Sequence, residues 1–503
     1  MLTLAEIVAM LPGARVVGDA ALRIDGVSTD SRTIAPGALF VALRGERFDG
    51  HDYLADVAQR GAAAALVARV PDQHAGLPLV VVPDTLAALG ALAARWRARF
   101  NLPLVAVTGS NGKTTTKEMT AAIFVAAFGA DQVLATAGNL NNDIGVPLTL
   151  LRLRAHHRAA VIELGMNHPG ETEGLAAMAA PTITLITNAQ REHQEFMQSV
   201  EAVAREHGLA VLALPATGVA VFPADDVHAT LWWSAAGKRR VIDFALRAAG
   251  GPFSPFLAAV TASVGQGSDA FETPVTLATP GGEVALTLRA AGLHNARNAA
   301  AATAAAIAAD VPLAAIRAGL ESFQPVKGRM QKKQCAAGAV LIDDTYNANP
   351  DSVLAAIDVL AGMPGPRTLV LGDMGEVGAA GPEFHAEVGA HAARRKIDRL
   401  LGLGTLARHA VDAAQGDGVL AMHCADIDQL IAAVHPHASA GTVLVKGSRF
   451  MRMERVVATL APSTASAASA PPAEAAAHGQ PAAPVSPAAP AQPAGKPNAE
   501  GRP

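Results

Sequence analysis

The stretch Thr108–Thr116 has the composition of a loop that binds phosphate groups. It reads TGSNGKTTT and directly follows the short apolar run Leu102–Val107, which should form a strand. Backbone N–H groups of such a loop, together with the N-terminus of the helix that follows, attract phosphate oxygens. Lys113 can reach the outer phosphates of a nucleotide, and the hydroxyl of Thr114 can ligate Mg²⁺. The stretch therefore predicts a site for a nucleoside triphosphate and Mg²⁺.

One position departs from the usual spacing of such loops. A glycine is normal five residues before Gly112, and Val107 stands there. The alternative interpretation is a glycine-rich turn ahead of an ordinary helix, but the strand and helix context favours phosphate binding. The residues expected to contact the nucleotide are Gly109, Ser110, Asn111, Gly112, Lys113, Thr114 and Thr115.

Two further candidate ligands stand near the ends of predicted strands. Glu163 ends the strand predicted at Ala160–Leu164, and His193 follows the strand predicted at Ile183–Thr187. The carboxyl ends of parallel strands meet at the edge of the sheet where nucleotides bind, and Mg²⁺ prefers carboxylate oxygen there. His193 can bind a second Mg²⁺ or its water. The alternatives are a solvated loop charge for Glu163 and a surface histidine for His193.

An alanine-rich segment carries a third group of polar residues. Leu293–Ala306 reads LHNARNAAAATAAA and predicts a closely packed helix with His294, Asn295 and Asn298 in and near its first turn. Asparagine is a favourable N-cap, so simple capping of the helix is the alternative interpretation for Asn295. Asn298, one turn later, can hydrogen-bond an adenine edge.

The last third of the chain offers an arginine and two aspartates. Arg329 lies in a predicted loop between domains and can neutralise charge on a transferring phosphoryl group, although a surface linker arginine is an equal alternative. Asp343 and Asp344 end the strand predicted at Val340–Asp343 and lead into the polar sequence TYNANPDS. An aspartate there can accept hydrogen bonds from ribose hydroxyls, and Tyr346 can stack on a base.

Alternating strands and helices must position these side chains. The alternation from residue 101 to about 320 predicts an α/β fold with a parallel sheet and helices on both faces. Thr and Val alternate in Phe271–Leu288 around Pro280–Gly282, which predicts an appended hairpin. The predicted domains are 1–83, 84–325 and 326–461, followed by the segment 462–503.

Composition excludes several classes of protein. A length of 503 residues predicts about three domains, and a net charge of −4 argues against nucleic acid or an anionic membrane as partner. The two cysteines cannot form a disulfide framework, and the chain shows neither a signal peptide nor an apolar run of ~20 residues. A cytoplasmic protein is expected. Residues 462–503 lack aromatic residues, Leu and Ile, which predicts a disordered tail, with a tether to a partner as the alternative.

Taken together, the motifs resemble those of the Mur ligase family. They cover residues 1 to about 460 in order and read TGSNGKTTTKE, GNLNNDIGVPLTLL, ELGMNHPGE, LHNARNAAAA, KGRMQ, IDDTYNANPDS and LVKGSRFMRME. The resemblance implies a three-domain architecture: a first domain that binds a UDP-sugar peptide, a central P-loop ATPase domain with a parallel sheet, and a C-terminal Rossmann-like domain. The third domain is expected to close over ATP and the incoming amine.

The resemblance also implies an activity in cell-wall precursor synthesis. The carboxylate of UDP-N-acetylmuramoyl-tripeptide attacks the γ-phosphate of ATP and becomes an acyl phosphate. The amine of D-alanyl-D-alanine then attacks the carbonyl and releases phosphate. Charge neutralisation is required because two anions must meet. The expected enzyme is a monomer that uses ATP and Mg²⁺.

Residue roles carried over from the resemblance are expectations too. Lys113, Arg329, His193 and Glu163 are expected to be catalytic, and Thr114, Glu163 and His193 to bind metal. Asn298, Arg329 and Asp343 are expected to hold ATP, with Asn298 on adenine and Asp343 on ribose. Expected substrate contacts are Ser31 for the UDP-sugar peptide, Asn139 or Asn142 near the reacting phosphate, and Asn347, Asn349 and Ser352 for D-alanyl-D-alanine.

One departure from the family pattern concerns a second metal. Members usually carry a lysine fourteen residues after the metal-site histidine, and this lysine becomes carbamylated to give a Mg²⁺-binding carboxylate. The corresponding residue here is His207, preceded by Glu206. The prediction is that Glu206 or His207 takes over the second metal, or that this site is weakened.

Three other functions compete with this interpretation. A ligase that adds a diamino acid usually carries an Asp-Asn-Pro-Arg motif, which is absent from this sequence. A folylpolyglutamate synthase lacks the N-terminal UDP-binding module. A non-catalytic nucleotide-binding scaffold would not need the full set of Lys113, Glu163, His193, Asn298, Arg329 and Asp343.

Overall fold

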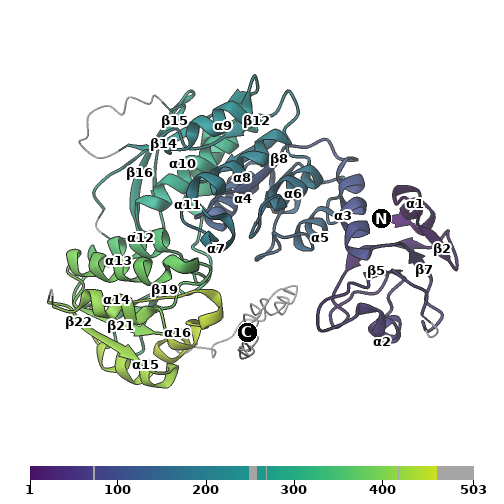
Figure 1. The fold of residues 1–503 in the computed structure, drawn as a ribbon. Helices are drawn as coiled ribbons and strands as arrows, with labels where there is room; N and C mark the ends of the chain where they lie inside the picture. The colour runs from purple at the N-terminus through teal and green to yellow at the C-terminus, as the bar shows by residue number, and fades with distance from the viewer. Residues whose placement is uncertain (72–73, 248–257, 268, 417, 462–503) are drawn as a thin grey trace, which may run out of the picture. The chain divides into compact units, whose positions relative to one another are not determined.

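The fold is that of a computed structural model, which describes residues 1–71, 74–247, 258–267, 269–416 and 418–461 (Figure 1). The tail predicted at 462–503 lies outside the described residues. Among the described residues, no helix has both the length and the apolar character needed to cross a membrane.

The N-terminal region forms a five-stranded sheet in the order β2-β7-β6-β5-β4. Only β2 runs antiparallel to its neighbour, and the other pairs are parallel. β1 and β3 pair separately. The elements are β1 (Leu2–Thr3), α1 (Leu4–Met10), β2 (Arg15–Val17), β3 (Arg23–Ile24), β4 (Gly26–Ser28), β5 (Ala38–Val41), the 3₁₀ turn Gly50–Tyr53, α2 (Leu54–Gln59), β6 (Ala64–Val67), β7 (Leu79–Val81) and α3 (Thr85–Arg97).

The central sheet is parallel throughout and has the order β13-β12-β11-β8-β10-β9. β8 lies between β10 and β11, so the chain connections from β8 and β10 run to opposite sides of the sheet. The loop after β8 lies at this switch point, which is the usual place for a ligand in such sheets. The elements are β8 (Leu104–Thr108), α4 (Lys113–Phe128), the 3₁₀ turn Ala130–Gln132, β9 (Val133–Ala135), α5 (Gly145–Leu150), β10 (Ala159–Glu163), α6 (Glu171–Ala179), β11 (Ile183–Ile186), α7 (Gln194–Met197), α8 (Val200–Leu212), β12 (Val219–Val221), α9 (Ala229–Ala236) and β13 (Arg240–Val241).

Side chains of β8 alternate between two separate cores. Val105 and Val107 pack with α4 and α10, whereas Leu104 and Ala106 pack with the core that contains α3. This burial on both faces explains why Leu104–Val107 is apolar at every position, as is typical of a central parallel strand. Val107 is fully buried, so the position where the usual motif has a glycine belongs to the strand rather than to the loop.

A four-stranded sheet follows, in the order β14-β15-β16-β17. The predicted hairpin is confirmed as the antiparallel pair β16 and β17, but it is part of a larger sheet because β14 and β15 extend it. The elements are β14 (Phe244–Arg247), β15 (Val260–Val264), β16 (Thr273–Thr279), β17 (Gly282–Leu288), α10 (Leu293–Ala308) and α11 (Leu313–Ser322). The alanines of α10 are buried against α4 and this sheet, which confirms the predicted close packing (Figure 1).

The C-terminal region forms a six-stranded sheet in the order β18-β19-β23-β20-β21-β22, in which only β18 is antiparallel. The elements are β18 (Gln331–Gln334), β19 (Val340–Asp344), α12 (Pro350–Ala361), β20 (Arg367–Gly372), α13 (Gly381–Arg394), β21 (Arg399–Leu403), α14 (Ala407–Ala414), β22 (Leu420–Cys424), α15 (Ile427–Val434), β23 (Thr442–Lys446), α16 (Glu454–Leu460) and the 3₁₀ turns Gly378–Ala380, His435–His437 and Arg449–Met451.

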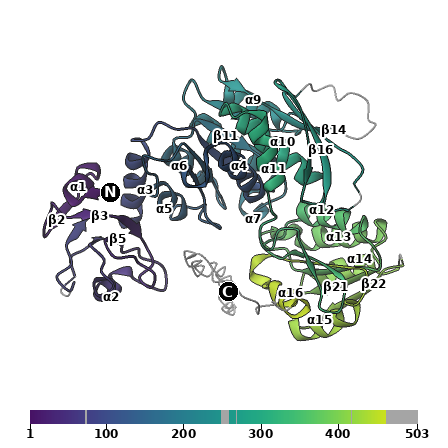
Figure 2. The same ribbon diagram turned by 180° about the vertical axis from the view of Figure 1, so that it is seen from behind.

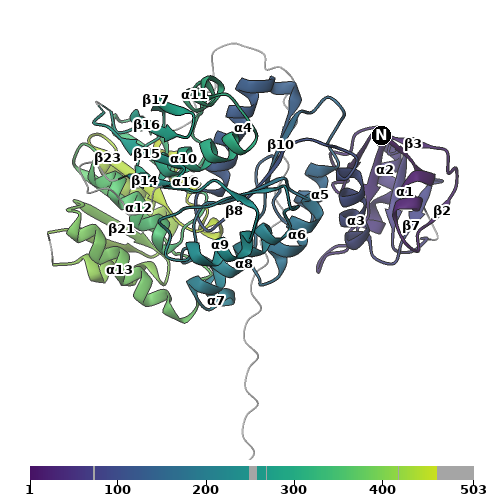
Figure 3. The ribbon, with the colours of Figure 1, turned by 90° about the horizontal axis from the view of Figure 1, so that it is seen from above.

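Helix α3 connects the N-terminal region to the central sheet. It packs on α5 and α6, and these three helices lie side by side in Figure 2, while α6, α8 and α9 follow one another in Figure 3. The buried Arg97 guanidinium donates to the carbonyls of Ala179 and Ala180, both at 3.1 Å, and Trp96 Nε1 donates to Leu153 O at 3.2 Å. The domain limits 83, 325 and 461 remain predictions from the sequence.

Gly389 permits the close approach of α13 and α14. A Cβ atom at this position would lie 2.0 Å from the carbonyl oxygen of Ala410. We expect Gly389→Ala to lower the free energy of unfolding by at least about 1–3 kcal/mol, because the backbone of α14 would have to move to make room for the new methyl group. The measurement is the thermal unfolding midpoint.

The matched control for Gly389 is Gly174→Ala in α6. A Cβ there would meet nothing within 4 Å, so the better helix propensity of alanine should stabilise by up to about 1 kcal/mol. Equal shifts in the two variants would contradict the packing argument.

Candidate functional site

Two glycines give the loop after β8 its shape. Gly109 and Gly112 have φ values of +126° and +83°. A Cβ at Gly109 would lie 2.1 Å from Thr187 Oγ1, and one at Gly112 would lie 2.4 Å from Asn298 Oδ1. Both backbone conformation and space therefore require glycine at these two positions.

Asn188 fixes the loop from the end of β11. Its carbonyl accepts from Ser110 N at 3.1 Å, its Oδ1 accepts from Asn111 N at 2.9 Å, and its Nδ2 donates to Asn111 O at 3.0 Å. Thr187 Oγ1 donates to the same Asn111 carbonyl at 2.7 Å. Asn188 could not be selected from the sequence alone, since its role depends on the pairing of β11 with β8.

Thr114 and Glu163 lie together, as the sequence predicts. Thr114 Oγ1 donates to Glu163 Oε1 at 3.1 Å, and Asn141 Nδ2 donates to the same oxygen at 2.9 Å. Both side chains are buried, and Glu163 Oε2 is buried without a hydrogen-bond partner. A hydroxyl beside a carboxylate oxygen with free lone pairs suits Mg²⁺, which usually takes one or two protein ligands plus phosphate oxygens.

Metal-ligating side chains do not gather in larger numbers here. Within the described ranges, no group of three or more His, Cys, Asp and Glu residues could hold a metal ion by itself. Any Mg²⁺ at Thr114 and Glu163 would therefore complete its coordination with substrate oxygens or water.

Glu192 is a buried carboxylate at the base of the loop. Its Oε2 accepts from Lys113 Nζ at 3.1 Å, and its Oε1 lies 3.0 Å from His207 Nε2. His207 Nδ1 in turn lies 3.0 Å from Thr108 Oγ1. Burial would raise the pKa of Glu192, but the charge of Lys113 and the contacts with His207 outweigh it and lower the pKa to about 2.

His193 groups with this carboxylate rather than with Thr114 and Glu163. His193 Nε2 lies 3.9 Å from Glu192 Oε2, and its Nδ1 lies 2.5 Å from Glu376 Oε2. The hydrogen bond from His193 lowers the pKa of the Glu376 carboxyl. The placement of His193 with the other two predicted metal ligands remains a prediction.

Glu206 serves a different purpose from the predicted one. Its two carboxylate oxygens accept from Gly170 N and Thr172 N, both at 2.9 Å, and so satisfy free amides at the N-terminus of α6. The structure therefore assigns Glu206 to α6 and brings His207, not Glu206, to the loop.

Of the asparagines near the loop after β9, Asn141 rather than Asn139 or Asn142 contacts Glu163. Asn139 and Asn142 are exposed, and Asn142 Oδ1 accepts from Gly145 N at 2.9 Å. Asn141, which the sequence analysis did not select, is the residue that contacts Glu163. The role of Asn139 or Asn142 at a reacting phosphate remains a prediction.

Asn298 lies against the loop, whereas Asn295 does not cap its helix. The N-cap of α10 is Gly292, and Asn295 Nδ2 donates to Ala291 O at 2.8 Å. Capping by Asn295, the alternative interpretation, is therefore wrong, because the N-cap lies three residues earlier. Asn298 is 6% exposed and its amide faces Gly112, so its contact with adenine remains a prediction.

The predicted residues of the C-terminal region already have protein partners. Asp343 accepts from Lys333 Nζ at 2.6 Å and from Thr345 Oγ1 at 2.6 Å. The Arg329 guanidinium lies over the Tyr346 ring, 4.0 Å from its centroid. The roles of Asp343 at ribose, of Arg329 at the transferring phosphoryl group and of Tyr346 at a base remain predictions.

Asn349 is the predicted substrate residue that reaches the phosphate loop. It caps α12 together with Ser352, and its Nδ2 donates to Asn111 Oδ1 at 2.9 Å. Asn347 donates nothing to the loop and instead offers its carbonyl to Lys446 at 2.9 Å. Ser31 lies half-buried in the turn after β4. Substrate contacts of these residues are untested predictions.

Arg191, which the sequence analysis missed, pairs with two carboxylates near the loop. Its guanidinium lies 2.7 Å from Asp351 Oδ1 and 2.6 Å from Glu387 Oε2, and it covers the Phe384 ring. A bidentate arginine of this kind fixes geometry as well as charge. Its partners are distant in sequence, so no local pattern could have revealed it.

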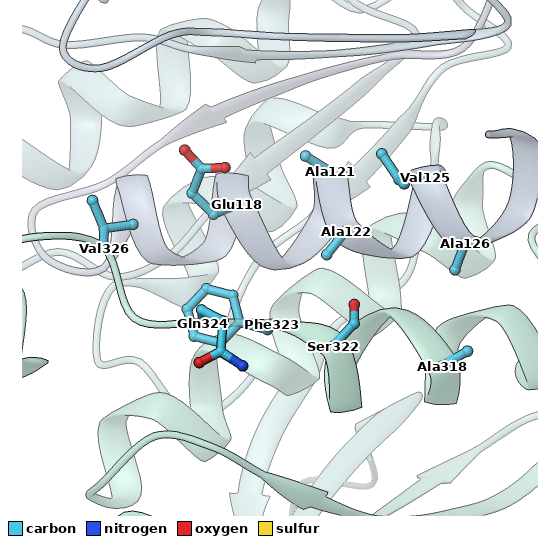
Figure 4. Close-up of a pocket in the computed structure, with 10 residues that line it drawn as sticks. All are labelled: Glu118, Ala121, Ala122, Val125, Ala126, Ala318, Ser322, Phe323, Gln324 and Val326. Atoms are coloured by element: carbon cyan, nitrogen blue, oxygen red, sulfur yellow. The ribbon is translucent and has the colours of Figure 1, made fainter. Parts of the chain in front are cut away.

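A pocket of about 550 Å³ lies between α4 and α11 (Figure 4). None of the residues predicted for nucleotide, metal or substrate lines it; its lining consists of Glu118, Ala121, Ala122, Val125, Ala126, Ala318, Ser322, Phe323, Gln324 and Val326. The candidate site is therefore the loop and its surroundings rather than this pocket.

Three family models match successive parts of the chain. They are the Mur ligase family catalytic domain at residues 23–97, the Mur ligase middle domain at 107–306, and the Mur ligase glutamate ligase domain at 328–449. The last two matches contain the phosphate loop and Asp343, respectively.

Curated relatives match along almost their whole length. The UDP-N-acetylmuramoyl-tripeptide–D-alanyl-D-alanine ligase of Escherichia coli is 42% identical, with 91% of this chain and 98% of the relative covered. The ligase of the same name from Haemophilus influenzae is 38% identical, with coverages of 89% and 96%.

A solved structure shows the same fold. MurF from Acinetobacter baumannii superposes with a TM-score of 0.81 at 34% identity, covering 91% of this chain and 98% of that one. Three consecutive family matches and a 42% identical relative covered almost completely decide the relationship: the chain belongs to the Mur ligase family.

Proposed function

We propose that the chain is an ATP-dependent amide ligase that joins D-alanyl-D-alanine to the peptide of UDP-N-acetylmuramoyl-tripeptide. The observation that carries this proposal is the 42% identity to the Escherichia coli ligase across 98% of that enzyme. Buried Thr114 and Glu163 beside Lys113 at the ends of β8 and β10 provide the site such a reaction needs.

The reaction has two stages. A peptide carboxylate oxygen forms a bond to the γ-phosphorus of ATP, and the bond to the bridging oxygen breaks to release ADP. The D-alanyl-D-alanine amine then bonds to the acyl carbon, loses a proton, and expels inorganic phosphate. Each stage brings a nucleophile to a centre that carries or develops negative charge, so fixed positive charge lowers the barrier.

Residues of the loop supply binding and orientation for the first stage. The amides of residues 112–113 at the N-terminus of α4 would hold phosphate oxygens, because those of Ser110 and Asn111 already donate to Asn188. Lys113 is the cation placed at the start of α4. Thr114 and Glu163 would hold Mg²⁺, which supplies charge neutralisation on the phosphates when bound. The monomeric state and the cytoplasmic location remain predictions from the sequence.

The deciding experiment is phosphate release from ATP by the full chain. Release should require both UDP-N-acetylmuramoyl-tripeptide and D-alanyl-D-alanine. Release with the dipeptide substrate and a diamino acid instead would show the ligase of the preceding addition. Tight ATP binding without release in any combination would show a non-catalytic nucleotide-binding protein.

Arg191→Ala tests whether contacts outside the loop support catalysis. Loss of the bonds to Asp351 and Glu387 should misplace the loop relative to α12, so kcat/KM for ATP is expected to fall about 10–100-fold. The measurement is steady-state phosphate release at varied ATP.

The control for Arg191 is Arg205→Ala. Arg205 forms an exposed pair with Glu201 within α8, which should contribute little, and the change should stay within about twofold. A similar loss in both variants would show that the Arg191 contacts have no specific role.

A further inference from the structure

The ammonium of Lys113 has no free N–H group in this structure. It donates to the carbonyls of Gly109 and Ser110 and to Glu192 Oε2. An ammonium has three donors, so all are used. If Lys113 is to bind a phosphate, as the proposed function requires, it must give up at least one of these partners.

Glu192 is the partner that cannot simply be released. Its side chain is 6% exposed, and Lys113 is the cation on its Oε2. Departure of Lys113 would leave a carboxylate oxygen buried without compensating charge, which is strongly unfavourable. A cation that takes the position of the ammonium would remove this cost when Lys113 moves from Glu192 to the nucleotide phosphates.

A second ligand for such a cation is already in place. His193 Nε2 lies 3.9 Å from Glu192 Oε2. Two ligands of one Mg²⁺ at ~2.1 Å each lie between about 3 Å and 4 Å apart, depending on their angle at the ion. His207 holds the other oxygen of Glu192 and is itself held by Thr108, so the carboxylate has a fixed orientation.

We propose that Glu192 and His193 bind a divalent cation that replaces Lys113 when the lysine moves to the nucleotide phosphates. This inference rests on the proposed function in one respect, because ATP binding is the event that moves Lys113 away from Glu192. It also explains how the chain can have His207 where family members usually have a carbamylated lysine. The carboxylate at this position comes from Glu192, and His207 orients it, so no modified lysine is needed.

The test uses Mn²⁺ as the probe and the full chain without nucleotide. Lys113→Met removes the ammonium, so Mn²⁺ should bind at Glu192 and His193 even though nucleotide is absent. Electron paramagnetic resonance of free Mn²⁺ gives the number of bound ions. Lys113→Met is expected to bind one ion more than the wild type, and Lys113→Met/Glu192→Gln is expected to lose it.

The matched control is Lys113→Met/Glu206→Gln. Glu206 is equally buried, but its oxygens accept from backbone amides, so this variant should bind Mn²⁺ as Lys113→Met does. Equal Mn²⁺ binding with and without Glu192, or no binding to Lys113→Met, would overturn the proposal.

A second arm covers the case in which Lys113→Met does not fold. With a non-hydrolysable ATP analogue, the wild type should bind one Mn²⁺ more than Glu192→Gln, or bind it at least about tenfold more tightly. Absence of analogue binding by the wild type would count against the proposed function. Binding of the analogue with equal Mn²⁺ in both proteins would overturn this inference alone.

Discussion

Lys113→Met is expected to abolish most of the ligase activity and to destabilise the protein at the same time. Loss of a preorganised positive charge at a developing anion should lower kcat about 10²–10³-fold. The same change leaves Glu192 buried without its cation, which should lower the free energy of unfolding by about 3–5 kcal/mol. Phosphate release and thermal unfolding measure the two effects.

The double variant Lys113→Met/Glu192→Gln separates these effects. Replacing both charges by neutral groups of similar shape should restore most of the stability, because no buried charge is left alone. Activity should remain low, since the phosphates still lack the ammonium. Recovery of activity together with stability would show that Lys113 has only a structural role.

Glu163→Gln is expected to produce the second largest loss. Gln Oε1 can still accept from Thr114 and Asn141, so the local structure should persist. The amide NH₂ would replace the buried, unpartnered Oε2 and could not ligate Mg²⁺. We expect kcat to fall about 10²-fold and the Mg²⁺ concentration for half-maximal rate to rise at least about tenfold.

A suitable control for Glu163 is Glu171→Gln. Glu171 is the first residue of α6, the helix that follows β10, but it is exposed and accepts from Asn167 N and His168 N. Its replacement should change the rate less than about twofold. An unchanged Mg²⁺ requirement in Glu163→Gln would contradict the assignment of this carboxylate as a metal ligand.

Local sequence patterns predicted the regular elements well. The strand predicted at Val340–Asp343 is β19, Val340–Asp344, and the hairpin predicted at Phe271–Leu288 appears as β16 and β17. Such elements depend on short-range alternation and on glycine at turns, which are visible in the sequence itself. The appearance of β14 and β15 beside the hairpin was missed because sheet extension is a long-range event.

Asparagines were harder to assign from the sequence. Asn295 has a favourable N-cap side chain, yet the helix begins at Leu293. A sequence pattern locates the end of a helix only to within about one or two residues. Asn139, Asn141 and Asn142 are chemically equal in sequence. Only the path of the loop after β9 decides that Asn141 reaches Glu163.

By itself, the sequence determined the class of site and the family pattern. Thr108–Thr116 specifies a phosphate loop because its glycines, lysine and threonine act within one short segment, whose geometry is local. The order of the motifs along the chain then pointed to a ligase rather than to a simple nucleotide-binding protein.

Only the tertiary structure decided how charge is balanced around that loop. Glu192 lies 79 residues from Lys113 and 15 residues from His207 along the chain, and the packing of β8, β11 and α8 brings the three side chains together. Burial makes their interaction strong, since a carboxylate removed from water must have a partner. The carboxylate that we propose in place of the missing lysine is therefore one that no local pattern could identify.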